Sequence, residues 1–142
     1  MKKTSLSILS LLLAFLCVLS FAACKEPTPT DPLWENAKYT ENTTVGEGAI
    51  AFELEVIAGE KSVTLTVNTD ESNLAAALLA LDLVTGEDGA YGLYVKTVNG
   101  ILADYDVDNT YWKLSKSGTD LMTGASGVTV ASGDHYEFTR AK

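Results

Sequence analysis

Apolar and polar residues alternate along two neighbouring runs near the middle of the chain. From residue 50 to residue 56 every second side chain is a large apolar one, and the same alternation returns over residues 63–67. A period of two is typical of a strand with one buried and one solvent-facing side. Residues 58–61, Ala-Gly-Glu-Lys, form a turn sequence between the runs. The pattern therefore predicts a β-hairpin.

The next pattern is helical. Residues 68–73 are rich in side chains that cap helix N-termini, and residues 74–81 consist only of leucine and alanine. Leu74, Leu78 and Leu81 share one face at helical spacing. We expect one helix that ends near residues 82–84 and packs its leucine face on the sheet.

Three further strands are predicted over residues 93–98, 111–115 and 136–139. A Gly-rich and acidic loop at 85–91 precedes the first, and a long glycine-containing loop at 116–132 lies between the last two. Asn99-Gly100 is a turn signal, and residues 128–130 form a short extended piece in the second loop. The predicted order is β-β-α-β-β-β. The expected fold class is therefore α+β: a β-grasp-like domain with one mixed sheet and a single helix packed across it.

The N-terminus carries the features of an export signal. Lys2 and Lys3 precede an apolar stretch over residues 6–21, and two alanines then lead to Cys24. The segment Phe-Ala-Ala-Cys resembles the lipobox of bacterial lipoproteins, in which the cysteine is acylated and becomes the first mature residue. We therefore interpret residues 1–23 as a signal peptide and Cys24 as the lipidation site. An uncleaved membrane anchor is the alternative.

Proline and threonine dominate the segment that follows. Pro27, Pro29 and Pro32 favour extended backbone, and the few apolar residues show no period. We expect residues 24–48 to be a tether and residues 49–142 to be the folded domain.

Charge and cysteine content reduce the range of possible functions. All nineteen acidic residues lie after the signal, against eight of the ten lysines and arginines, so the mature net charge is −11. Such a surface disfavours nucleic acid. Because Cys17 leaves with the signal, the mature chain has one cysteine and no internal disulfide or cysteine metal site. We expect an extracytoplasmic protein held to the membrane of the bacterial envelope by lipid on Cys24.

No catalytic set is visible. His135 is the only histidine, and its position at the start of the last strand favours an exposed strand end over a catalytic or metal-binding role. Asp104, Asp106 and Asp108 have a spacing that suggests calcium, but the segment lacks the glycine and the distal glutamate of an EF-hand loop. We therefore expect neither a metal site nor an enzyme.

The central stretch carries a more specific resemblance. Residues 92–101 contain a Val-Asn-Gly-Ile turn, residues 110–113 read Thr-Tyr-Trp-Lys, and Leu121 and Gly124 follow. With the Gly-Asp step before the last strand, this pattern resembles the C-terminal β-domain of the cobalamin carriers intrinsic factor and transcobalamin. It also resembles uncharacterised bacterial lipoprotein domains. The resemblance covers residues 63–138.

In those carriers the small domain closes over one face of the corrin, and a helical domain holds the other. The resemblance implies ligand-facing positions at Asn99, Tyr111, Trp112, Leu121, Met122 and Gly124. Together with the lipobox, it implies a lipid-anchored module that binds a corrinoid, with cobalamin as ligand rather than cofactor. The ligand would be half exposed unless another protein supplies the second half. Docking onto an envelope or transport protein is the alternative. The Tyr111-Trp112 pair could equally be ordinary strand packing.

Overall fold

The structure is a computed structural model that describes residues 31–142, and Asp31–Lys142 form one compact unit. The expected signal peptide, Cys24 and the first residues of the expected tether lie outside the described residues. Within the described part, no helix is long and apolar enough to cross a membrane.

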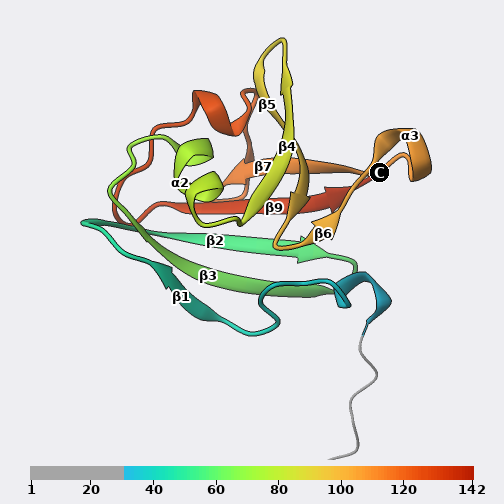
Figure 1. The fold of residues 1–142 in the computed structure, drawn as a ribbon, viewed down its shortest axis with the longest axis horizontal. Helices are drawn as coiled ribbons and strands as arrows, with labels where there is room; N and C mark the ends of the chain where they lie inside the picture. The colour runs from blue at the N-terminus through green and yellow to red at the C-terminus, as the bar shows by residue number, and fades with distance from the viewer. Residues whose placement is uncertain (1–30) are drawn as a thin grey trace, which may run out of the picture. The chain divides into compact units, whose positions relative to one another are not determined.

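A six-stranded sheet forms the base of the domain (Figure 1), in the order β1-β3-β2-β9-β7-β8. Its pairings are antiparallel except β1 with β3 and β2 with β9, which are parallel. The strands are β1 (Thr43–Gly46), β2 (Ile50–Ala58), β3 (Lys61–Thr69), β7 (Tyr111–Lys116), β8 (Thr119–Asp120) and β9 (His135–Ala141).

The predicted hairpin is confirmed by β2 and β3. Leu54 pairs with Leu65 and Val56 with Val63, and all four side chains are buried. Burying a side chain of this size stabilises the fold by about 1.5–3 kcal/mol. The alternation seen in the sequence therefore reflects one face turned to the core and one turned to solvent.

The predicted helix is confirmed as α2 (Leu74–Ala80). Asn73 caps it, since its side-chain oxygen accepts a hydrogen bond from the Ala76 N–H at 3.1 Å. Leu74 and Leu78 are fully buried. The helix thus packs its leucine face on the core, as expected.

The expected single mixed sheet is wrong. A second, three-stranded sheet consists of β4 (Val84–Gly89), β5 (Gly92–Val98) and β6 (Ile101–Leu102). Residues 85–91, expected as a loop, belong largely to the β4–β5 hairpin, whose register shifts between Thr85 and Gly86. The strand was missed because β4 is exposed along its length apart from Val84, so no apolar alternation marks it. The domain is mostly β, with two sheets rather than one, so the expected α+β, β-grasp-like class is wrong as well.

The second sheet and α2 lie on the same side of the large sheet (Figure 1). Between them lies a continuous apolar core that includes two edge-to-face aromatic pairs, Phe52–Tyr136 and Trp112–Phe138. The opposite face of the large sheet carries the alternate, mostly polar side chains of β2, β3, β7 and β9.

Part of the expected tether is folded. The 3-10 turn η2 (Pro32–Trp34) places Trp34 in the core with 1% of its surface exposed, and its indole Nε1 donates to the Ala58 carbonyl at 3.0 Å. Strand β1 extends the large sheet at its edge. A four-residue edge strand is too short to show a period, so the sequence pattern does not mark this boundary.

The region after β6 contains two short helical turns, α3 (Tyr105–Asp108) and η3 (Ala125–Gly127). The expected extended piece at residues 128–130 is represented by an isolated bridge between Thr129 and Asn73. The η3 segment packs against β5 and α2.

Candidate functional site

Asn99, expected to face a ligand, is buried and structural. It lies in the left-handed region with a φ of 53°, and none of its surface is exposed. Its side-chain oxygen accepts from the Tyr39 N–H at 2.9 Å, and its amide donates to the Tyr39 carbonyl at 2.7 Å. The Asn99 side chain is therefore occupied by the segment that precedes β1.

The Tyr111-Trp112 pair is divided between the two faces of β7. Trp112 is buried, and its Nε1 donates to the Lys96 carbonyl at 3.2 Å. Tyr111 is exposed on the opposite face. Since neighbouring side chains of a strand point in opposite directions, these two residues do not line one site together.

An open apolar groove lies at the end of the β4–β5 hairpin, with a cavity volume of about 300 Å³. This tip groove is lined by Gly89, Ala90, Tyr91, Gly92, Leu93, Tyr94 and Gly124. The Leu93 N–H donates to Ser126 Oγ at 3.0 Å, which joins β5 to η3. The hairpin end is thereby held beside the loop that contains Gly124.

Of the residues expected at the site, Gly124 lines the tip groove, and two others lie just before it in the chain. Met122 is fully exposed, whereas Leu121 is partly buried against the core. The sequence did not indicate Tyr91 or Tyr94, although 95% of the Tyr91 surface is exposed. The sequence did contain one signal for this site, namely the position of Tyr91 directly before Gly92 in a glycine-rich turn.

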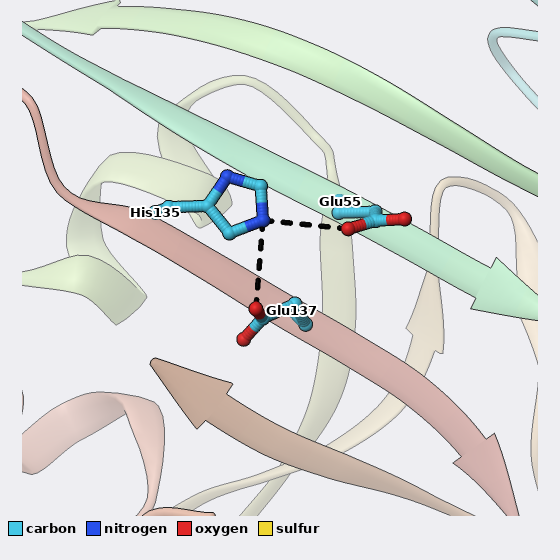
Figure 2. A group of neighbouring side chains, drawn as sticks. All are labelled: Glu55, His135 and Glu137. Atoms are coloured by element: carbon cyan, nitrogen blue, oxygen red, sulfur yellow. Dashed lines mark hydrogen bonds and ion pairs between the residues drawn. The ribbon is translucent and has the colours of Figure 1, made fainter. Parts of the chain in front are cut away.

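A second group of side chains lies on the open face of the large sheet. Neighbouring positions of the parallel strands β2 and β9 place Glu53 beside His135 and Glu55 beside Glu137. Figure 2 shows one ring nitrogen of His135 facing both Glu55 and Glu137. We call these four residues the His135 cluster.

Short contacts hold the His135 cluster together. His135 Nδ1 lies 2.9 Å from Glu53 Oε2, and Nε2 lies 3.3 Å from Glu55 Oε2 and 3.5 Å from Glu137 Oε1. The hydrogen bond to Glu53 is the largest influence on the pKa of His135 and raises it. Burial opposes that effect, but Glu55 and Glu137 also favour the charged ring, so the pKa lies above its usual value.

The carboxylate of Glu137 is incompletely satisfied. Its Oε1 accepts from the Gly118 N–H at 2.9 Å, while its Oε2 is buried without a hydrogen-bond partner. Among the described residues, Glu53, Glu55 and Glu137 form ion pairs with His135 alone and with no lysine or arginine. Three carboxylates therefore surround one imidazole.

The His135 cluster was missed by sequence reasoning. His135 was expected as an exposed strand end, although Glu53 and Glu55 alternate outward on β2 and Glu137 does the same on β9. Those alternations were visible. The adjacency of strands about 80 residues apart was not, because no turn connects them.

The three aspartates considered for calcium do not converge. Asp104 caps α3 by accepting from the Asp106 N–H, and Asp108 pairs with Arg140 at 2.8 Å. Within residues 31–142 the potential metal-ligand group is Glu55, His135 and Glu137.

Comparisons with known proteins place this fold in a family. Residues 71–141 match the domain of unknown function DUF4430. No curated protein matches the chain. A crystal structure of a candidate metal-binding protein from Ruminococcus gnavus ATCC 29149 is 32% identical, with a TM-score of 0.62, over 66% of this chain and 98% of that one.

A second crystal structure, of haptocorrin in complex with Cbi, is 25% identical with a TM-score of 0.54. The match covers 66% of this chain but only 25% of the haptocorrin chain. Haptocorrin is a cobalamin carrier, so the similarity to carriers expected from the sequence is confirmed at the level of the fold. The chain belongs to the DUF4430 family and has a transcobalamin-like fold.

Proposed function

We propose that this protein is a non-catalytic binding module, anchored outside the cytoplasm through acylated Cys24, that takes a corrinoid ligand at the tip groove. The observation that carries the proposal is the exposed aromatic end of the β4–β5 hairpin, in a fold shared with a protein that binds Cbi. The acidic surface of the mature chain and the lipobox-like sequence fit such a location.

The chemistry of the tip groove suits a flat ligand. Tyr91 and Tyr94 offer ring faces together with hydroxyl groups, and Leu93 adds apolar surface. Aromatic side chains of this kind supply large contact areas and a polar end. Glycines around the groove leave its rim free of further side chains, so a ligand can approach the backbone closely.

The tip groove is too small to enclose a whole corrinoid. About 300 Å³ is at the lower end of the range for small-molecule pockets. A corrin is larger than that, so the hairpin end contacts one face or edge of the ligand. A second protein is expected to cover the remainder, which makes the affinity of this domain alone modest.

Titration of the mature protein with cobalamin, followed by ligand absorbance and protein fluorescence, tests the proposal. Tyr91→Ala should weaken binding by about tenfold or more, which corresponds to about 1.4 kcal/mol. Tyr105→Ala is the matched control, because Tyr105 is also exposed but lies on α3. No response at millimolar cobalamin overturns the corrinoid assignment. Tyr91-dependent capture of an envelope protein would then favour the alternative, a docking module.

Cation binding is a second candidate function, and the His135 cluster is the observation that favours it. The similar protein from R. gnavus is itself described as a candidate metal-binding protein. The tip groove and the His135 cluster share no residue, so the two functions are compatible.

A further inference from the structure

We propose that Glu55, His135 and Glu137 are three protein ligands of a divalent zinc-class cation on the open face of the large sheet, with Glu53 as the residue that positions the imidazole. The inference rests on the second candidate function. It adds the site, the coordination and the class of metal.

The two distances from the imidazole to the carboxylates match a tetrahedral ion. With zinc–ligand bonds of about 2.0–2.1 Å, two donors on a tetrahedron lie about 3.3–3.4 Å apart. His135 Nε2 lies 3.3 Å from Glu55 Oε2 and 3.5 Å from Glu137 Oε1. All three donor atoms lie within 4.8 Å of one another. The two distances to the imidazole therefore fit the ion as they stand, and the two carboxylates close around it from no more than 4.8 Å apart.

Glu53 holds the imidazole in the orientation that a metal-bound histidine requires. Glu53 Oε2 lies 2.9 Å from His135 Nδ1, so this nitrogen donates its proton to a carboxylate. Nε2 is the nitrogen that faces Glu55 and Glu137 (Figure 2), so a cation that displaces the proton from Nε2 would find all three donor atoms side by side. A carboxylate on the outer nitrogen is the usual partner of a metal-bound histidine.

The local charge also favours a divalent cation. Glu53, Glu55 and Glu137 together exceed any positive charge that His135 can carry, and no described lysine or arginine pairs with them. The buried Oε2 of Glu137 has no hydrogen-bond partner. An unsatisfied buried polar atom costs about 1–3 kcal/mol. The donor nearest His135 is the other oxygen, Oε1, so a cation offsets this cost only if it also engages Oε2.

The backbone around the site is rigid. Both ligand-bearing strands are interior to the large sheet, since β2 lies between β3 and β9, and β9 lies between β2 and β7. Sites built on such strands hold their geometry more precisely than sites on loops. Glu137 is fixed further by the Gly118 N–H at the turn between β7 and β8. The side chains of His135 and Glu55 are both partly exposed, so water or a ligand group can complete the coordination.

Calorimetry of the metal-stripped mature protein with Zn²⁺ tests the site, with Co²⁺ absorption as a readout of geometry. One equivalent should bind, and Co²⁺ should give the intense visible bands of a tetrahedral complex. His135→Ala and Glu137→Gln should each lower Zn²⁺ affinity by more than about 100-fold. Glu53→Gln should lower it by about 10–100-fold. Glu60→Gln, at an exposed glutamate of the β2–β3 turn, is the matched control and should bind as the wild type does.

The possible outcomes distinguish a failure of the cation-binding function from a wrong assignment of the ligands. Absence of any cation binding by the wild type overturns the second candidate function, and the site with it. Stoichiometric binding that His135→Ala and Glu137→Gln leave unchanged retains cation binding but overturns this site. Weak Co²⁺ bands typical of six-coordination overturn the tetrahedral assignment. Circular dichroism verifies that each variant is folded.

Discussion

The side-chain amide of Asn99 forms two hydrogen bonds with the backbone of Tyr39, as a neighbouring strand would. Two backbone bonds reinforce the junction: Lys38 N–H donates to the Asn99 carbonyl at 2.9 Å, and Asn99 N–H donates to Leu83 at 2.7 Å. One buried residue thus connects the segment before β1 with the second sheet.

Replacing Asn99 by glycine should destabilise the domain by about 1–3 kcal/mol. Glycine tolerates the left-handed backbone, so the loss isolates the two buried amide hydrogen bonds, each contributing about 0.5–1.5 kcal/mol. Urea denaturation measures the change. Asn109→Gly is the control, since Asn109 has a φ of 59° but is exposed, and it should change stability by less than about 0.5 kcal/mol. Equal effects of the two variants would contradict the role given to the Asn99 amide.

The same residue shows where sequence reasoning succeeds and where it ends. Asn99-Gly100 correctly indicated a turn, because an asparagine followed by glycine favours positive φ. Its ligand role came from resemblance alone. The actual partner lies 60 residues earlier, in a segment without apolar period, and no local pattern identifies it.

Local patterns also explain which parts of the fold were predicted. The hairpin of β2 and β3 and the helix α2 each have one buried face. Apolar residues therefore recur along them with the period of a strand or a helix, and the sequence shows this directly. The β4–β5 hairpin is largely exposed and glycine-rich, and hydrogen bonds rather than burial define it. The His135 cluster depends on a parallel pairing between distant strands. Periodicity says nothing about such pairings.

Trp34→Ala should destabilise the domain by about 3–5 kcal/mol, although Trp34 lies in the segment expected as a tether. The indole is buried, donates to the Ala58 carbonyl, and has the Lys61 ammonium 4.9 Å from its ring centroid. Urea denaturation of the mature protein measures the loss. Tyr91→Ala removes another large aromatic side chain but an exposed one, so its stability should match the wild type. A stable Trp34→Ala protein would show that residues 31–48 contribute little to the fold.

Stability should decrease as the pH falls below about 5, and Asp134 should contribute to that decrease. Burial is the largest influence on Asp134 and opposes its ionisation, but hydrogen bonds from Lys116, Tyr136 and the Ala131 N–H outweigh it. The pKa of Asp134 is therefore lower folded than unfolded. Such a group stabilises the fold above its unfolded pKa of about 3.9, and the contribution is lost as pH falls through the folded value.

Asp134→Asn tests this contribution through urea midpoints measured from pH 7 to pH 2. The variant should be less stable than the wild type near neutral pH, and the difference should shrink on acidification. A difference that is constant with pH would contradict the charge-based role. Tyr136→Phe is the companion variant, because Tyr136 Oη donates to Asp134 Oδ2 at 2.8 Å. It should weaken the acid dependence without abolishing it, since Lys116 remains 3.0 Å from Asp134.

Cys24→Ala should transfer the protein from the membrane fraction to the soluble fraction of the producing bacterium. The expected anchor is the lipid on Cys24, and each buried methylene of an acyl chain contributes about 0.8 kcal/mol to membrane binding. Fractionation followed by immunoblotting, with radiolabelled fatty acid as a second readout, measures both events. Retention of the variant in membranes without label would favour the uncleaved-anchor alternative.

Gly92→Ala should disrupt the tip groove, because two constraints meet at this glycine. Its φ is +95°, and an added Cβ would lie 2.7 Å from Ser126 Cβ and 2.8 Å from Ser126 Oγ. Gly133→Ala has a similar φ of +87° but no atom within 4 Å of the added carbon, so it isolates the backbone strain of about 1–2 kcal/mol. Urea denaturation should show a larger loss of stability for Gly92→Ala than for Gly133→Ala.

Cobalamin titration should show weakened binding for Gly92→Ala alone. The added methyl group separates the end of β5 from η3, whereas Gly133 lies away from the groove, in the turn before β9. Unchanged binding by Gly92→Ala would show that the contact between β5 and η3 does not shape the ligand site.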